Sequence, residues 1–216
     1  MMNSKNKIFV FVIDNSPTTL TGLRLLFFHT KDIEMIGDTQ NGYDAYAIIQ
    51  NLKPMVVVFD ISTPGPDPSE LTKWIFENHP NTKTLIFTSI KSDRLLANTM
   101  DSGASGYISK EVTEAEIINA IRQTARGLKL FDNDQYQRAG KWKNMVGEKI
   151  SQLTTREIEI LKMLTKGLGN HEISVILGIS IKTAAYHVSN VLAKLQVKSR
   201  QEAAIWGLRH LSEDLA

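Results

Sequence analysis

The amino-acid sequence predicts two domains of different fold class. The first is an α/β domain built on a doubly wound, five-stranded parallel sheet, and the second is a smaller all-α domain of four helices. In residues 1–126, short apolar runs alternate five times with segments of helical period, which is typical of a parallel sheet covered on both faces. In residues 150–216, apolar residues recur at helical period. Residues 127–149 have no sustained period, so we interpret them as a linker, part of which can be helical.

The boundaries of individual elements follow from local signals. Pro54 ends one expected helix, because proline cannot continue the helical hydrogen bonding. Thr113 and Glu116 have the spacing of a capping box, and so do Thr154 and Glu157 in the second domain. The expected strands are 8–13, 34–39, 55–59, 84–88 and 106–109, and the expected helices of the first domain are 17–28, 42–52, 69–78, 93–101 and 114–126.

Four polar side chains stand at the carboxyl ends of predicted strands. Asp14 follows the first strand, Asp60 the third and Lys110 the fifth, while Thr88 ends the fourth. In doubly wound sheets these strand ends meet in one crevice, where ligands bind. Each residue alone is better explained as a helix cap or a loop residue. The four together predict a site for phosphate and metal chemistry.

The second domain is predicted to contain a helix-turn-helix. A short helix at 170–177 ends at Gly178, which can adopt the left-handed conformation of a tight turn. Ser180 can then cap a second helix at 181–195. On geometry alone, an ordinary helical hairpin with a solvated polar face remains the alternative. The apolar stripe of the second helix comprises Ala184, Val188, Val191 and Leu195, and its opposite face comprises Lys182, Tyr186, Ser189 and Ala193.

Composition excludes several classes of protein. The chain has 216 residues and no cysteine, so disulfides, thiolate metal sites and cysteine catalysis are excluded. No apolar run is long enough for a membrane span, and the early run at 8–13 is a poor export signal. We therefore expect a cytoplasmic protein. Residues 1–126 hold 12 Lys and Arg against 14 Asp and Glu, whereas residues 127–216 hold 13 against 9, so the second half is the basic one.

The first half resembles the receiver domain of two-component response regulators, which has a flavodoxin-like fold. The resemblance rests on five motifs that together span nearly all of residues 7–126. They are 13–17 (IDNSP), 58–60 (VFD), 63–65 (TPG), 87–89 (FTS) and 103–110 (GASGYISK).

The resemblance implies a role for each residue of the crevice. Asp60 would be the phospho-acceptor, attacking the phosphohistidine of a sensor histidine kinase as a covalent nucleophile. Thr88 and Lys110 would bind the transferred phosphoryl group, and Tyr107 would move inward with Thr88. A Mg²⁺ ion would be held by Asp14, Asn15, Asp60 and the backbone carbonyl of Ser62.

The chain departs from the receiver pattern at two places. Asn15 stands where the family has a second acid, so we expect weaker Mg²⁺ binding. The loop after Asp60 carries Pro66 and Pro68, which stiffen it. The alternative is therefore an atypical pseudo-receiver, which would bind DNA without phosphorylation and respond to a protein partner or small ligand.

The second half resembles the LuxR/FixJ-type DNA-binding domain over about sixty residues. The matching segments are 153–161 (LTTREIEIL), 167–173 (GLGNHEI), 177–183 (LGISIKT), His187, 194–195 (KL) and Arg200. The resemblance implies a four-helix module whose third helix, 181–195, enters the major groove of double-stranded DNA. The fourth helix, from Arg200 onward, often supports dimers in this family.

This resemblance also assigns DNA contacts residue by residue. Phosphate contacts are expected from Lys182, Thr183, His187, Asn190, Lys194 and Arg200, and base contacts from Ala185, Tyr186 and Ser189. The family commonly has lysine at the position of Ala185, so direct guanine readout is lost there. Because the face has few basic groups, tight binding should need a homodimer on a two-fold operator.

Together these features predict a DNA-binding transcriptional regulator with no enzymatic activity of its own. Two other classes were weighed. A phosphatase of the haloacid-dehalogenase type would use Asp60 as nucleophile, but it needs a second aspartate where this chain has Ser62. A pure protein-interaction module would not need an intact helix-turn-helix.

Overall fold

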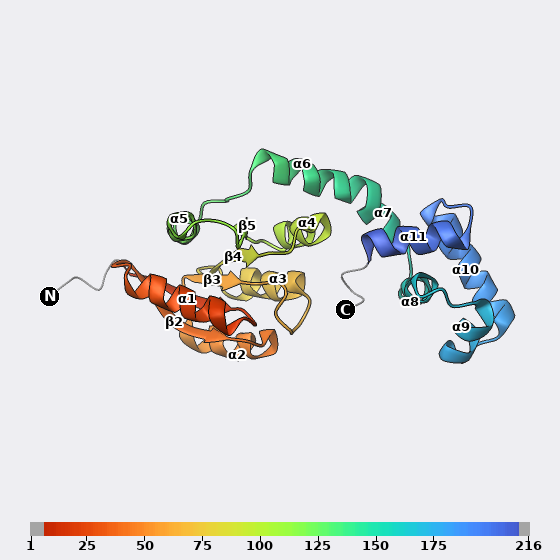
Figure 1. Ribbon diagram of the computed structural model, residues 1–216, viewed down its shortest axis with the longest axis horizontal. Coiled ribbons are helices and arrows are strands. Elements are labelled where there is room, and N and C mark those ends of the chain that lie inside the picture. Colours follow the sequence, from red (N-terminus) through yellow and green to blue (C-terminus); the bar gives the residue numbers. More distant parts are fainter. Residues whose placement is uncertain (1–6, 212–216) are drawn as a thin grey trace. The chain divides into compact units, whose positions relative to one another are not determined.

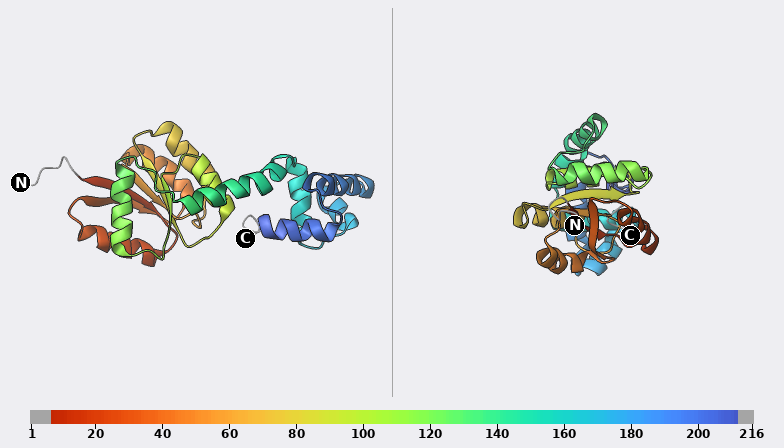
Figure 2. Two further views of the ribbon diagram at one scale, coloured as in Figure 1. Left: turned by 90° about the horizontal axis from the view of Figure 1, so that it is seen from above. Right: turned by 90° about the vertical axis from the view of Figure 1, so that its left-hand side faces the viewer.

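The computed structural model describes residues 7–211, which divide by their contacts into two compact units, with the boundary between Ala139 and Gly140. The first unit contains a five-stranded sheet in which every strand pair is parallel, with the order β2-β1-β3-β4-β5. Figure 1 shows helices on both sides of this sheet, and Figure 2 shows the same layers from two further directions. The predicted fold class is confirmed.

Most elements of the first unit begin and end within a residue or two of their predicted bounds. The strands are β1 Ile8–Ile13, β2 Ile33–Thr39, β3 Val56–Phe59, β4 Lys83–Thr88 and β5 Gly106–Ser109. The helices that alternate with them are α1 Pro17–Phe28, α2 Gly42–Leu52, α3 Pro68–Asn78, α4 Asp93–Asp101 and α5 Glu114–Ala125.

The core of the first unit follows from the alternation of side chains along the strands. Val10, Val12 and Val58 pack with Phe27 of α1 and Ile121 of α5 on one face of the sheet. The intervening strand residues point to the other face, where α2, α3 and α4 pack. The central strands are buried on both faces, which is why β1 and β3 are continuous apolar runs.

The segment expected to be a linker is largely helical. It contains α6 Asn133–Trp142, a π-helical turn Lys143–Gly147 and α7 Glu148–Ser151. Residues 127–139 group with the first unit and 140–149 with the second. Part of the segment was expected to be helical, but no sustained period was visible because α6 presents little apolar surface, with Ala139 as its one buried residue among those described.

The second unit has the four predicted helices, α8 Thr155–Thr165, α9 Asn170–Leu177, α10 Ile181–Leu195 and α11 Arg200–His210. Their shared core contains the whole predicted stripe of α10. Gly178 lies in the left-handed region at φ 63°, and Ser180 caps α10 by accepting a hydrogen bond from the Thr183 N–H. Both predicted capping boxes are present, at Thr113 and Thr154.

No single helix in the described part of the chain is both long and apolar enough to cross a bilayer. The bent pair α9 and α10, with 109° between the two helices, meets that test of length and composition only when the two are taken together.

Candidate functional site

An acidic crevice lies at the carboxyl ends of the strands. Ile13 of β1 is aligned with Phe59 of β3, so the residues that follow them, Asp14 and Asp60, come side by side. Their exposed fractions are 1% and 3%. The Nζ atom of Lys110, beyond the end of β5, lies 2.7 Å from Asp14 Oδ2 and 2.5 Å from Asp60 Oδ2. The sheet therefore brings together the two acids and the lysine that the sequence placed at strand ends.

The loop after β3 holds the Asp60 carboxylate from its other side. The Ser62 hydroxyl donates to Asp60 Oδ2 at 2.6 Å, and the Ser62 backbone N–H donates to Asp60 Oδ1 at 3.1 Å. The resemblance implies a role only for the backbone carbonyl of Ser62, so the contact of its hydroxyl with Asp60 is an addition to that prediction. The loop is pinned to α2, because a Cβ on Gly65 would lie 2.8 Å from Gly42 Cα. Glycine at position 65 is therefore a requirement of this close approach.

After Gly65, residues 66–68 (Pro-Asp-Pro) lead into α3. Asp67 accepts a hydrogen bond from the Ser69 N–H at 2.8 Å, and Pro68 is the first residue of the helix. Pro68 therefore has a structural reason as the first residue of α3.

The charges of the crevice are set by burial and by these contacts. Burial alone would raise the pKa of Asp60, but hydrogen bonds from Lys110, Ser62 and Thr88 outweigh it and leave the pKa below its usual value. For Lys110, burial lowers the pKa, while hydrogen bonds to Asp14 and Asp60 raise it above the usual value. At neutral pH Asp60 is therefore an ionised carboxylate beside a charged ammonium.

The donors present suit a magnesium ion. The crevice holds two acidic side chains against one lysine, and Mg²⁺ commonly takes one or two carboxylates and keeps several waters. Asn15 is exposed at the rim. Within residues 7–211 there is no cluster of three or more His, Asp or Glu side chains, so the remaining ligands would be amide, carbonyl or water oxygens.

Thr88 and Tyr107 lie beside the crevice and are joined to each other through Ile90. Thr88 is buried, helps to lower the pKa of Asp60, and accepts a hydrogen bond from the Ile90 N–H at 3.3 Å. The Tyr107 hydroxyl donates to the Ile90 carbonyl at 2.8 Å, and the residue is buried. The Tyr107 side chain therefore points into the protein, and its role as a switch stays a prediction.

The outward face of α10 carries most of the residues expected to contact DNA. Tyr186 has 64% of its surface exposed. Two hydroxyls on this face have local partners, since Thr183 pairs with the capping residue Ser180 at 2.8 Å and Ser189 donates to the Ala185 carbonyl at 3.0 Å. The exposed members are Lys182, Thr183, Tyr186 and Ser189, and the half-buried members are Ala185, His187 and Asn190.

Two of the expected DNA-binding cations make internal contacts, which sequence reasoning did not predict. Lys194 Nζ lies 2.6 Å from Glu157 Oε2, and Glu157 is 3% exposed and caps α8. Burial would raise the pKa of Glu157, but Lys194 and Thr154 bring it below its usual value. Arg200 donates to the Leu168 carbonyl. No internal partner of Lys182 is found within the described residues.

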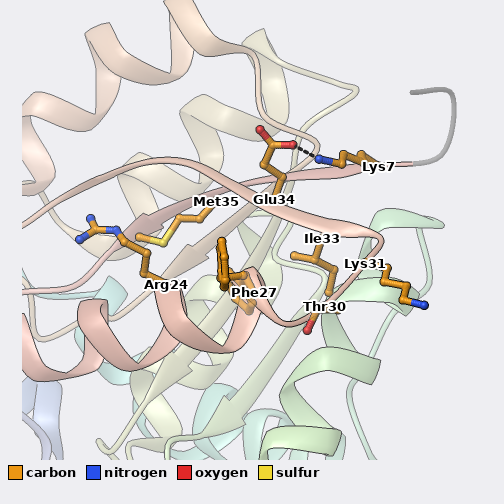
Figure 3. Close-up of a pocket in the computed structure, with 9 residues that line it drawn as sticks. Lys7, Arg24, Phe27, Thr30, Lys31, Ile33, Glu34 and Met35 are labelled. Carbon is orange, nitrogen blue, oxygen red and sulfur yellow. Dashed lines mark hydrogen bonds and ion pairs between the residues drawn. The ribbon is translucent and has the colours of Figure 1, made fainter. Parts of the chain in front are cut away.

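A cavity of about 410 Å³ lies away from these sites, between α1 and β2 (Figure 3). Phe27, Ile33 and Met35 line it, and Lys7 pairs with Glu34 at its rim at 2.6 Å. It opens near the start of β2, at the opposite end of the sheet from Asp60, and shares no residue with the crevice.

Comparison with known families matches both halves of the chain. Residues 10–122 match the family described as response regulator receiver domain. Residues 151–206 match bacterial regulatory proteins of the luxR family.

Known proteins match along nearly the whole chain. The response regulator protein VraR of Staphylococcus aureus is 32% identical over 201 residues, covering 93% of this chain and 96% of VraR. The crystal structure of response regulator ChrA, from a heme-sensing two-component system, covers 94% of this chain and 98% of its own at 28% identity, with a TM-score of 0.55.

RcsB of Salmonella enterica serovar Typhimurium, bound to a promoter in the presence of the phosphomimetic BeF₃⁻, has a TM-score of 0.62 at 22% identity, over 93% of this chain and 98% of its own, which supports the fold. With a receiver domain in its first half and a LuxR-family domain in its second, the chain belongs to the DNA-binding response regulators of the LuxR family.

Proposed function

We propose that phosphorylation of Asp60 controls DNA binding by this regulator. One observation carries the proposal: the ionised, buried carboxylate of Asp60 stands beside Asp14 and is contacted by Lys110, Ser62 and Thr88. This is a carboxylate held in its nucleophilic form among groups that bind a phosphoryl oxygen.

In the proposed transfer, Asp60 Oδ forms a bond to phosphorus as the bond from phosphorus to the histidine nitrogen of a sensor kinase breaks. Lys110 would then pair with a phosphoryl oxygen, and the Thr88 hydroxyl would turn from the carboxylate to another. Mg²⁺, held by Asp14, Asp60 and oxygens of Asn15 and Ser62, would neutralise the charge of the incoming group.

The DNA half would act as a homodimer on a two-fold operator. Ala185, Tyr186 and Ser189 would face base edges, and Tyr186 offers the largest surface for them. Lys182 is proposed as the principal phosphate contact, with Thr183, His187 and Asn190 beside it. Lys194 and Arg200 would contribute their positive charge to the phosphate backbone from the internal contacts described above.

The first experiment is the intact mass of the full chain after treatment with acetyl phosphate, with and without Mg²⁺, beside an Asp60→Ala control. A single phosphoryl adduct that needs Mg²⁺ and is absent from the control is the expected result. A mass that is unchanged after treatment with acetyl phosphate and with a panel of histidine kinases would contradict the proposal and favour the pseudo-receiver.

With its DNA target and its kinase, the regulator would act in the cytoplasm.

A further inference from the structure

Residues 129–138 follow the open edge of the sheet, beside β5. The Leu130 N–H donates to the Ser105 carbonyl at 2.6 Å, and Leu130 forms a parallel bridge with Gly106. Lys129 Nζ donates to the carbonyls of Gly103 and Ala104, at 3.2 and 2.6 Å. We call residues 129–138 the strap. Since β5 is an edge strand, the strap covers backbone groups that would otherwise be open to pairing.

Gln135 fastens the start of α6 to β5. Its Nε2 donates to the Tyr107 carbonyl at 2.7 Å, while its Oε1 accepts from the Asp132 N–H at 3.2 Å. Asp132 in turn accepts from the Gln135 N–H at 2.7 Å, so the two residues cap α6 reciprocally. If the Gln135 amide rotated by half a turn, its bond to the Tyr107 carbonyl and its bond to the Asp132 N–H would therefore be lost together.

Arg138, one turn further along α6, fastens the same helix to α4. Its Nε donates to Asp93 Oδ1 at 2.7 Å and its NH2 group lies 2.6 Å from the same oxygen. Asp93 is the first residue of α4, where a negative charge is favoured by the helix dipole. The two side chains are 38% and 45% exposed, so the pair is moderate in strength.

The strap is connected to Thr88 by a chain of hydrogen bonds, and the Thr88 hydroxyl is among the groups that lower the pKa of Asp60. Thr88 accepts a hydrogen bond from the Ile90 N–H. The Ile90 carbonyl accepts from the Tyr107 hydroxyl, and the Tyr107 carbonyl accepts from Gln135. A cavity of about 140 Å³ lies along this chain, lined by Thr88, Tyr107, Gln135 and Arg138 among others.

We propose that Gln135 and Arg138 are positioning residues that couple the docking of α6 on β5 and α4 to the phosphorylation of Asp60. The inference rests on the proposed function. When Thr88 turns to a phosphoryl oxygen, its bond to the Ile90 N–H must adjust, and with it the Ile90 carbonyl that holds the Tyr107 hydroxyl. This changes how strongly the Tyr107 carbonyl holds Gln135 and, through Gln135, α6. By linkage, docking of α6 must change the affinity for a phosphoryl group by the same factor as that group changes the docking.

The test uses the full chain and beryllofluoride with Mg²⁺ as the probe. Hydrogen exchange of residues 129–142 is followed by mass spectrometry as beryllofluoride is titrated, which gives both the docking of α6 and the midpoint of binding. The variant is Arg138→Gln. The matched control is Gln137→Ala, at an exposed position on the same helix.

We expect Arg138→Gln to speed hydrogen exchange in α6 by roughly fivefold, because the variant loses a partly exposed ion pair in which two Arg138 nitrogens contact Asp93 Oδ1. The beryllofluoride midpoint should move by a comparable factor, and Gln137→Ala should change neither.

Two results would overturn the inference. One is faster exchange in α6 with an unmoved midpoint, since α6 would then dock without coupling. The other is unchanged exchange in Arg138→Gln. Failure of the wild-type chain to respond to beryllofluoride at all would instead refute the proposed phosphorylation, and the coupling would fall with it.

Discussion

The acidic crevice and the outward face of α10 use charge in opposite ways. In the crevice two buried carboxylates and Lys110 are locked together by short contacts. On α10 the residues proposed to face bases are small or neutral and largely open, and of the nearby cations Lys194 and Arg200 have internal contacts. The crevice therefore depends on a balance of buried charges. The α10 face instead presents an aromatic ring and hydroxyl groups, while Lys194 and Arg200 make contacts within the domain.

The largest test of this contrast is Lys110→Ala. Removal of the ammonium leaves Asp14 and Asp60 facing each other in a buried crevice, so we expect a loss of roughly 2–4 kcal/mol in the free energy of unfolding without Mg²⁺. Urea unfolding of the full chain measures it. Tyr186→Ala, on the exposed face of α10, should change the same quantity by less than about 0.5 kcal/mol. Equal losses in the two variants would break the contrast.

Base readout on the α10 face is tested by DNA binding of Tyr186→Ala. On an operator selected from random DNA, we expect affinity to fall by roughly 1–3 kcal/mol, because Tyr186 supplies the largest exposed surface on this face. Affinity for unrelated DNA should hardly change. A uniform loss on all sequences would show that Tyr186 contacts the backbone instead.

A smaller effect is expected from Lys182→Ala. This lysine is exposed and has no internal partner within residues 7–211, so its charge is available to a phosphate. Binding should weaken for every sequence, and the salt dependence of the affinity should drop by about one ion per protomer. The comparison variant is Lys194→Ala, which should in addition lower stability, because it leaves the buried Glu157 carboxylate without its ammonium partner. Loss at a single operator, with the salt slope intact, would argue against a phosphate role for Lys182.

The smallest expected effect is on pH dependence. The pKa of Asp60 is lowered in the folded state, so its contribution to stability is present above the unfolded value of about 3.9 and is lost as pH falls through the folded value. Asp60→Asn should therefore flatten the fall of unfolding free energy below about pH 4. Unfolding curves at several pH values check this, and parallel curves for the two chains would be inconsistent with the lowered pKa.

The regular elements were predictable from sequence because their signals are local. Continuous apolar runs mark β1 and β3, and the caps of α5 and α8 are visible at fixed spacing. The meeting of Asp14 with Asp60 was also predictable, since parallel strands put their carboxyl ends on one edge.

What could not be predicted depends on polar contacts between distant residues. The strap is held by bonds to backbone carbonyls of β5 and the turn before it, and a carbonyl has no signature in sequence. The Lys194–Glu157 pair joins residues 37 positions apart, and Glu157 was identifiable only as a cap. Short-range patterns could not assign these residues to the fold instead of to DNA.

The internal contacts of Lys194 and Arg200 have a consequence for how such a regulator diverges. These two side chains help tie α10 and α11 to the rest of their domain, whereas Tyr186 and Ser189 are exposed and Ala185 is half-buried, and none of the three belongs to the apolar core of the domain. A duplicated gene could therefore exchange those three residues, and acquire a new set of target promoters, without passing through an unstable intermediate.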